Sequence, residues 1–462
     1  MYLNMEFDTQ IKDINQDEIS EELINKHIEL IPYPQPLDFL SKPENTMFTN
    51  LFYVIKLNKQ YIQIDKLKES ILKSLNNHKG LLSTFILKKE EKLFNNGIYL
   101  NYESKNEIKI EEIKIKDNIE KTELEELFQH NLEVFKHFNS PQINIKIFYN
   151  NCDIYLFIDI CHTVLDGASI SVFFNSINNA YLNKELPKDY FLYYLYKYNK
   201  EIKESPKYKE DLTYFQKYFI HDKDLYPKYN NSLSKKDFVI IAKTLTWDNL
   251  RTNLTKYFSI PNSNKITNYN IFLLMNIILA NYLYSNMDES HHELNFTFSG
   301  RDWKREKYSV GCLSTDYPVY FNFDSKGKLN MKNFYNLIKK QLELKNNISR
   351  YPYFHSDKGR LPVIIQREKE FLNINNFCGD NTAKIIYDFT NKFNNKCNIF
   401  WSPLSVVMTI GDNLAKYDIM ADGSKYSVEN IKYYKELIEK SGKFILKNMD
   451  KINSDDIINI EI

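Results

Sequence analysis

Short apolar runs alternate along most of the chain with segments that carry apolar residues at helical spacing. Residues 52–57, FYVIKL, are rich in β-branched and aromatic side chains. Leu67, Ile71 and Leu75 then recur at intervals of four. The first pattern is typical of a buried strand and the second of one face of a helix, so the sequence predicts a strand, a turn and a helix here.

Two predicted strands and a helix surround one short loop. Residues 143–149 and 154–161 are two apolar runs separated by a polar turn. The stretch 170–181 then carries apolar residues at every third or fourth position, as one face of a helix requires. The segment 161–169, CHTVLDGAS, therefore joins the carboxyl end of a strand to the start of a helix.

The second half of the chain shows the same alternation. Its longest apolar run, 271–280, is interrupted by Asn276 and is shorter than the roughly 20 residues that cross a bilayer, so residues 269–284 predict a buried helix. Alternation in both halves favours an α/β sandwich in each. The other predicted strands are 81–87, 98–102, 238–245, 294–298, 317–323, 384–389 and 406–410, and the other predicted helices are 121–138, 211–220, 247–258, 331–344 and 428–449.

The length of the chain and a proline-containing connection near its middle predict two domains. The chain has 462 residues, of which 43% are hydrophobic, and this exceeds what one core usually supports. A stretch rich in Lys and Tyr, residues 182–206, contains Pro187 and Pro206 and is typical of a connection. We therefore predict an N-terminal domain over 1–185 and a C-terminal domain over 186–462.

Charge and cysteine usage narrow the possible partners. Lys and Arg number 61 against 60 Asp and Glu, so no basic field attracts nucleic acid or an anionic membrane. The first twenty residues are acidic and polar and lack a signal-peptide pattern. Five scattered cysteines fit neither a disulfide framework nor a zinc site. We expect a cytoplasmic, monomeric protein that holds no metal.

His162 is the candidate catalytic residue in the 161–169 loop. An acyl transfer to an amine or alcohol needs a group that accepts a proton near neutral pH, and imidazole suits that role best. Gly167 permits close approach of a thioester carbonyl to backbone N–H groups. Asp166, if buried, needs a partner, and Arg301 is the Arg that we expect to pair with it. The residues alone leave open that His162 simply ends a strand and that Asp166 caps a helix.

Four segments in order resemble the condensation-domain branch of the chloramphenicol acetyltransferase-like superfamily. Residues 161–169 resemble its His-His-x-x-x-Asp-Gly loop, and 77–85, NHKGLLSTF, resemble its early Leu-Arg-Thr motif. Residues 298–301, FSGR, resemble its strand ending in Gly-Arg, and 310–315, VGCLST, its Val-Gly motif. The chain departs from these patterns where Cys161 replaces the first His and Leu82 replaces Arg.

The resemblance implies an arrangement of the whole molecule. Each half is expected to be a chloramphenicol acetyltransferase-like lobe, an α/β sandwich, and the two form a V with a tunnel between them. It also implies that Asp166 and Arg301 form a structural ion pair. The candidates for tunnel lining are Cys161, Ser314, Trp401 and Ser402. Packing in the core is the alternative for Cys161, and ordinary strand packing is the alternative for Trp401 and Ser402.

The resemblance also implies a reaction. His162 would assist an amine that attacks an acyl or aminoacyl thioester on the phosphopantetheine arm of a carrier protein, while backbone N–H groups near Gly167 stabilise the oxyanion. The expected partners are acyl or peptidyl carrier proteins and a small acceptor, with no permanently bound cofactor. Two alternatives stay open: ester formation from coenzyme A thioesters and alcohols, and a non-catalytic recruitment role in an assembly line.

Overall fold

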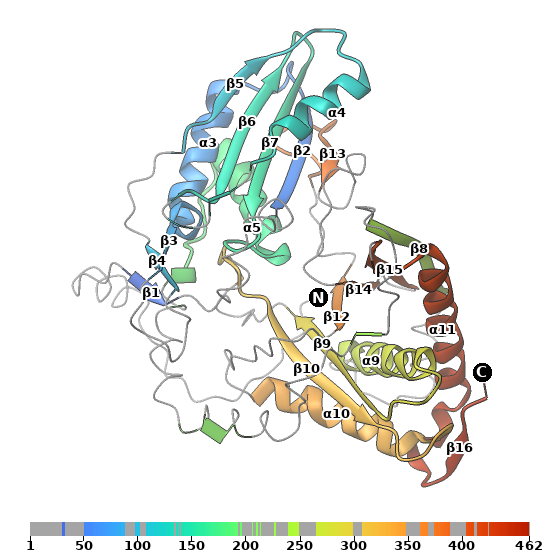
Figure 1. The fold of residues 1–462 in the computed structure, drawn as a ribbon. Helices are drawn as coiled ribbons and strands as arrows, with labels where there is room; N and C mark the ends of the chain where they lie inside the picture. Colours follow the sequence, from blue (N-terminus) through green and yellow to red (C-terminus); the bar gives the residue numbers. More distant parts are fainter. Residues whose placement is uncertain are drawn as a thin grey trace.

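The computed structural model shows two lobes, each built on one large sheet (Figure 1). The residues that it describes are 30–32, 50–87, 98–101, 108–192 apart from 134, 137 and 139, 239–248, 265–298, 307–347, 361–367, 374–388, 403–410 and 414–461 apart from 424, with single positions between 195 and 227.

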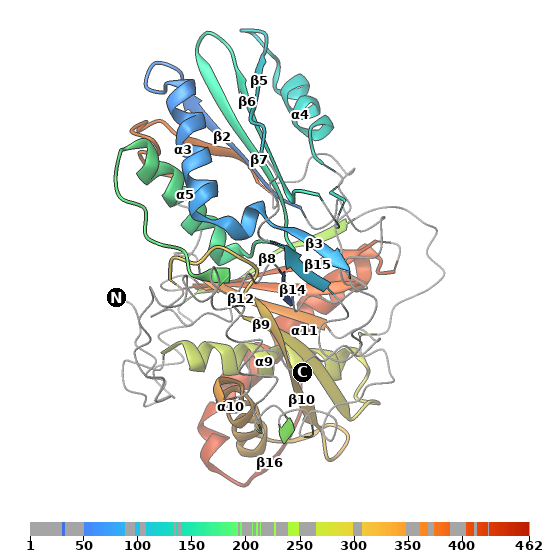
Figure 2. The ribbon, with the colours of Figure 1, turned by 90° about the vertical axis from the view of Figure 1, so that its left-hand side faces the viewer.

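The first lobe is a five-stranded sheet covered by helices on both faces (Figure 2). In spatial order its strands are β13 (Lys384–Asp388), β2 (Asn50–Asn58), β7 (Asp153–Cys161), β6 (Ile143–Tyr149) and β5 (Glu111–Lys114). Helices α3 (Ile64–Asn77) and α5 (Gly167–Tyr181) cover one face and α4 (Lys121–His130) covers the other.

Alternation along the strands explains why both faces are covered. In β2, Leu51, Tyr53 and Ile55 belong to the core under α3 and α5, whereas Phe52 and Val54 belong to the core under α4. Successive strand residues point to opposite faces, so a strand that is apolar at every position requires a layer on each side.

The second lobe is a six-stranded sheet with three helices packed against its core. In spatial order the strands are β10 (Thr315–Asn322), β9 (His291–Phe298), β12 (Leu361–Arg367), β14 (Leu404–Ile410), β15 (Leu414–Asp422) and β8 (Val239–Asp248). The helices are α9 (Lys265–Tyr284), α10 (Met331–Asn347) and α11 (Val428–Lys447). The described part of α9 is buried almost throughout, as its continuous apolar run predicts.

Two small sheets and two single-turn helices complete the described fold. Strands β1 (Leu30–Pro32), β4 (Ile98–Asn101) and β3 (Thr84–Leu87) form one sheet, and β11 (Lys328–Asn330) pairs with β16 (Ile457–Asn459) in the other. The 3₁₀ helices are Lys79–Leu82 and Met449–Asn453. Among the helices that the structure describes, none combines the length and apolar character needed to cross a membrane.

The chain crosses between the lobes at two described places. The crossover segment, which we define as residues 309–314, places Val310, Cys312 and Leu313 in the core of the first lobe and leads directly into β10 (Figure 1). Strand β13 pairs with β2 and so adds residues from the second half of the sequence to the first lobe's sheet. The boundary near residue 185 remains a prediction.

Several predicted elements have different bounds in the structure. Helix α4 ends at His130 and not at residue 138, because Glu133 N donates to Asp159 Oδ2 instead of continuing the helix. Strand β8 reaches Asp248, so Trp247 lies in a strand and not in the predicted helix 247–258. Residues 79–82, at the start of the predicted strand 81–87, form a 3₁₀ turn. The predicted helix 211–220 lies almost wholly outside the described residues.

Candidate active site

A tight turn follows β7 and leaves His162 partly exposed. Val164 N donates to Cys161 O at 3.1 Å, and Leu165 N donates to His162 O at 3.4 Å, so the chain reverses directly after the strand. Between residues 161 and 167, only His162 and Gly167 are not buried. An imidazole at the mouth of an otherwise buried turn can meet a substrate while its backbone is held by the fold.

Asp166 connects this turn to α5 and to the crossover segment. Its side chain is buried, and its Oδ1 accepts a hydrogen bond of 2.9 Å from Ser169 N, which makes Asp166 the N-cap of α5. Its Oδ2 accepts from Leu313 N at 2.9 Å and from Ser314 N at 3.0 Å. One carboxylate therefore fixes the turn, the start of α5 and the crossover segment, whose Leu313 lies 147 positions further along the chain.

Ser169 adds a second connection to the crossover segment. Its hydroxyl accepts a hydrogen bond of 3.0 Å from Gly311 N. Its single hydroxyl hydrogen lies between two acceptors, Gly311 O at 2.7 Å and Asp166 Oδ1 at 2.9 Å. The first turn of α5 and the crossover segment consequently hold each other through side-chain-to-backbone hydrogen bonds.

Gly167 is the first residue of α5 and is exposed. It does not have the positive φ that would require glycine, and a Cβ atom placed on it would meet nothing within 4 Å. The backbone conformation therefore does not explain the glycine. What its absent side chain leaves is open space at the first N–H groups of the helix.

A profile of the family described as "Condensation domain" matches residues 39–355, which is more than half of the chain. The chain belongs to the condensation-domain family. Condensation domains are acyltransferases that use carrier-protein thioesters, and the predicted family membership is confirmed. A comparison with curated proteins finds no match.

Solved structures of low sequence identity share the fold of this condensation domain. The epimerization domain from the third module of tyrocidine synthetase B superimposes with a TM-score of 0.65 at 14% identity, covering 92% of this chain and 98% of that one. A variant of the rhizomide synthetase starter condensation domain, solved in complex with C8-CoA, gives 0.65 at 10% identity, covering 95% and 100%. The predicted fold class, α/β with two chloramphenicol acetyltransferase-like lobes, is confirmed.

The structure places the other predicted site residues of this condensation domain as follows. Ser314 is partly exposed, and its main-chain N–H contacts Asp166. Cys161 is fully buried, and its Sγ lies 3.0 Å from Thr163 Oγ1. Arg301, Trp401 and Ser402 lie outside the described residues, so the ion pair with Asp166 and the two tunnel positions remain predictions.

Asp159 is a buried titratable group that the sequence reading overlooked. Its Oδ2 accepts from Asn50 Nδ2 at 3.0 Å and from Glu133 N at 2.7 Å, but no described residue hydrogen-bonds its Oδ1. Burial raises the pKa of Asp159 to about 8, although the two hydrogen bonds oppose the shift. A lone acid in the apolar run IYLFIDIC was the available signal, because a charge in such a strand is either paired or neutral.

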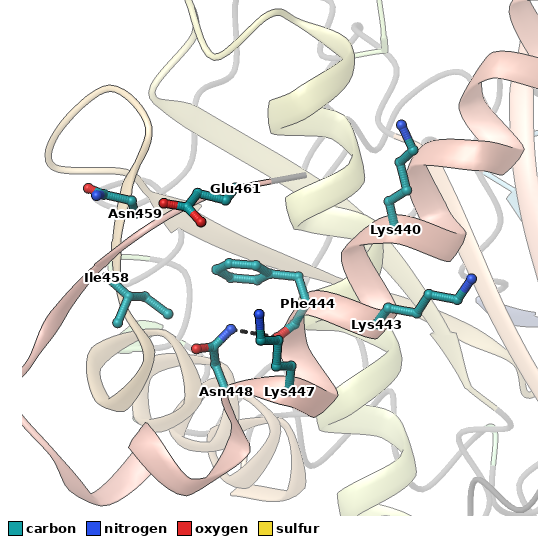
Figure 3. Close-up of a pocket in the computed structure, with 8 residues that line it drawn as sticks. All are labelled: Lys440, Lys443, Phe444, Lys447, Asn448, Ile458, Asn459 and Glu461. Carbon is teal, nitrogen blue, oxygen red and sulfur yellow. Dashed lines mark hydrogen bonds between the residues drawn. The ribbon is translucent and has the colours of Figure 1, made fainter.

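A surface groove of about 400 Å³ lies far from the His162 turn. It runs between the carboxyl end of α11 and β16 (Figure 3). Phe444 and Ile458 form its apolar part, and Lys440, Lys443 and Lys447 stand around it. Lys443 pairs with Glu439 at 2.6 Å, and the acidic Glu461 also lines the groove. None of its lining residues belongs to the turn or to the crossover segment.

Proposed function

We propose that this condensation domain forms an amide by transferring an acyl group from a carrier-bound thioester to an amine, with His162 assisting the attack. The observation that carries the proposal is the partial exposure of His162 in a turn whose other residues up to Asp166 are buried. A general base must reach its substrate and hold one position, and this turn provides both conditions.

The groups around His162 fit the charge changes of such a reaction. The imidazole accepts the proton that the attacking amine loses, and the thioester carbon bonds to nitrogen as its bond to sulfur breaks. The departing thiolate takes up a proton and leaves as a thiol. The first N–H groups of α5, at Gly167 and Ala168, are suitable donors to the transient oxyanion, because a helix N-terminus favours negative charge.

Two alternatives are specific enough to test. The rhizomide synthetase starter domain was solved in complex with C8-CoA, which favours offering coenzyme A thioesters as donors and alcohols as acceptors. Replacement of the family's first His by Cys161 favours a second alternative, a recruitment module without catalysis. The intact His162, Asp166 and Gly167 support the catalytic role.

The test offers purified wild-type protein and a His162→Ala variant two donors and two acceptors. The donors are an acyl carrier thioester and an acyl-coenzyme A, and the acceptors are an amine and an alcohol. Products are followed by intact mass. We expect amide formation from the carrier thioester and a loss of about 100-fold or more in the variant, the range for removal of a general base.

The control is His130→Ala. His130 is an exposed residue at the end of α4, and its Nδ1 contacts Glu126 O in the same helix. The His130→Ala variant should catalyse acyl transfer at the wild-type rate. Ester formation from acyl-coenzyme A would replace the proposed reaction with the first alternative. Equal turnover in wild type and His162→Ala would overturn the assignment of His162, and no turnover in either protein would favour recruitment.

A further inference from the structure

His78 forms a buried hydrogen-bond relay between two helices and the connection after α5. It follows α3, and its side chain is 1% exposed. Its Nδ1 lies 2.7 Å from Asp189 Oδ2, and its Nε2 lies 2.8 Å from Ser176 Oγ on α5. A neutral ring with the proton on Nδ1 satisfies both contacts, donating to the carboxylate and accepting from the hydroxyl.

The order Ser176, His78, Asp189 matches that of a nucleophile, a base and an orienting acid, but its burial assigns another role. Ser176 is 4% exposed, and the side chains of His78 and Asp189 are 1% and 4% exposed. A nucleophile must touch its substrate, whereas these three groups are enclosed between α3, α5 and the connection. The relay therefore acts on the structure around it.

Asp189 connects His78 to the crossover segment. The same Oδ2 that faces His78 accepts a hydrogen bond of 3.1 Å from Val310 N. Its Oδ1 accepts from Phe191 N at 2.8 Å, which sets the direction of the chain at the aromatic residue. The ring of Phe191 covers Gly311 so closely that a Cβ there would lie 2.1 Å from a ring carbon.

The crossover segment is consequently fastened on two sides. Asp166 and Ser169 accept the N–H groups of Gly311, Leu313 and Ser314, as described above. Asp189 accepts the N–H of Val310, and Phe191 packs against Gly311. Loss of either side frees main-chain groups on the segment that holds Asp166, the residue that ends the His162 turn.

We infer that His78 is a positioning residue for His162, acting through Asp189 and the crossover segment. His78 holds the Asp189 carboxylate against Val310 N, the segment then holds Asp166, and Asp166 fixes the turn. This inference rests on the proposed function for its effect on catalysis, but its structural part is measurable without a substrate.

Three variants separate the two contacts of His78, which we call the Asp189 arm and the Ser176 arm of the relay. In His78→Asn the side-chain amide occupies the position of Nδ1 and keeps a donor for Asp189, but it loses Ser176. In His78→Gln the amide reaches the position of Nε2 and keeps Ser176, but it loses Asp189. Ser176→Ala removes only the Ser176 arm and is the matched control.

The readout is amide hydrogen exchange by mass spectrometry, compared over residues 309–314, over 162–169 and over α11. For His78→Gln we expect exchange at least about 10-fold faster in the first two regions and unchanged in α11, since local opening is measured separately from global unfolding. His78→Asn and Ser176→Ala should stay within about 3-fold of wild type in all three. With the proposed reaction running, kcat should fall in His78→Gln with little change in KM, and His78→Asn should restore it.

Two results would overturn the inference: equal acceleration in α11, which would mean general destabilisation, or no acceleration over 309–314 in His78→Gln. Asp189→Asn weakens the same arm and should reproduce the pattern of His78→Gln, and it replaces that variant if His78→Gln does not fold. Absence of acyl transfer in the wild-type protein would remove the proposed function alone, because the exchange pattern requires no substrate.

Discussion

Asp166 and Asp159 are two buried acidic residues that flank His162 in the sequence, and they differ in their hydrogen-bond partners. Both oxygens of Asp166 accept main-chain N–H groups, from Ser169, Leu313 and Ser314. Only one oxygen of Asp159 has a described partner, and burial raises its pKa to about 8. Both oxygens of Asp166 thus have main-chain donors, whereas burial favours the protonated form of Asp159.

This difference follows from the number of main-chain N–H donors that lie near each carboxyl group. Asp166 lies where the crossover segment presents the N–H groups of Leu313 and Ser314, which both donate to its Oδ2. Asp159 follows Phe157 by two residues on the same apolar face of the sheet, where Glu133 N donates to it. A buried acid with too few donors takes up a proton rather than remaining charged.

The largest effect on acyl transfer is expected for Asp166→Asn. The amide keeps one oxygen for Ser169 N but turns an NH₂ group toward the N–H groups of Leu313 and Ser314, which are donors themselves. We expect a loss of about 2–3 kcal/mol in the free energy of unfolding, measured with urea. Acyl transfer should fall about 100-fold, because displacement of His162 disturbs its alignment with the substrate.

The matched control for this variant is Asp455→Asn, at an exposed carboxylate that pairs with Lys332. Removal of a surface ion pair changes stability by less than about 1 kcal/mol. If Asp166→Asn were as stable and as active as Asp455→Asn, the anchoring role of Asp166 would be wrong.

An opposite effect on stability is expected for Asp159→Asn, and it depends on pH. In the folded protein Asp159 keeps its proton up to about pH 8, while in the unfolded chain it ionises near its ordinary pKa of 3.8. The folded state therefore binds more protons between these values, so wild-type stability falls as pH rises, by up to about 1.4 kcal/mol per pH unit from this group.

Asp159→Asn removes that slope and leaves an amide donor where the neutral carboxyl has its O–H. The variant should gain stability over wild type as pH rises from 5 to about 8, and the difference should level off above the folded-state pKa of about 8. Urea unfolding at a series of pH values measures this difference in the free energy of unfolding. Parallel pH profiles of the two proteins would show that Asp159 is ionised in the folded state.

The smallest effect on stability is expected for Gly167→Ala, and this variant tests whether substrate uses the open space at Gly167. A methyl group there meets no atom within 4 Å, so the free energy of unfolding should change by less than about 1 kcal/mol. Acyl transfer should nevertheless fall if substrate occupies that space. Unchanged kcat and KM in Gly167→Ala would mean that the acyl group does not pass beside Gly167.

Gly311→Ala provides the contrast to this variant. Its methyl group would lie 2.1 Å from the Phe191 ring, and overpacking of this kind costs about 1–3 kcal/mol. Comparison of the two thermal or urea transitions therefore tests whether the crossover segment is packed as tightly as the structure indicates. Two glycines that the sequence does not distinguish should differ clearly in their tolerance of alanine.

The sequence predicts the elements around the site well, because their apolar patterns are local. The runs at 143–149 and 154–161, the apolar stripe of α5 and the buried helix α9 are all found in the structure. The family motif also placed His162 correctly at the end of β7. Each of these features depends on residues that are neighbours in sequence.

The sequence does not reveal what holds the turn. The contact between Asp166 and Leu313 joins residues 147 positions apart. It uses a main-chain N–H, so the residue type at position 313 gives no sign of it. The His78 relay depends in the same way on a loop position, Asp189, that pattern alone gives no reason to select. The pairing of β13 with β2 was likewise hidden, because a short apolar strand carries no information on its partner.

The measurement that tests the central claim most directly is the single-turnover rate of acyl transfer from a carrier-bound thioester in wild type and His162→Ala. The affinity of each protein for a non-reactive thioether analogue of the donor is determined in parallel. The account predicts analogue affinities within about 3-fold of each other and a rate at least about 100-fold lower in the variant, since a general base acts in the transition state. Equal single-turnover rates at equal affinity would contradict it.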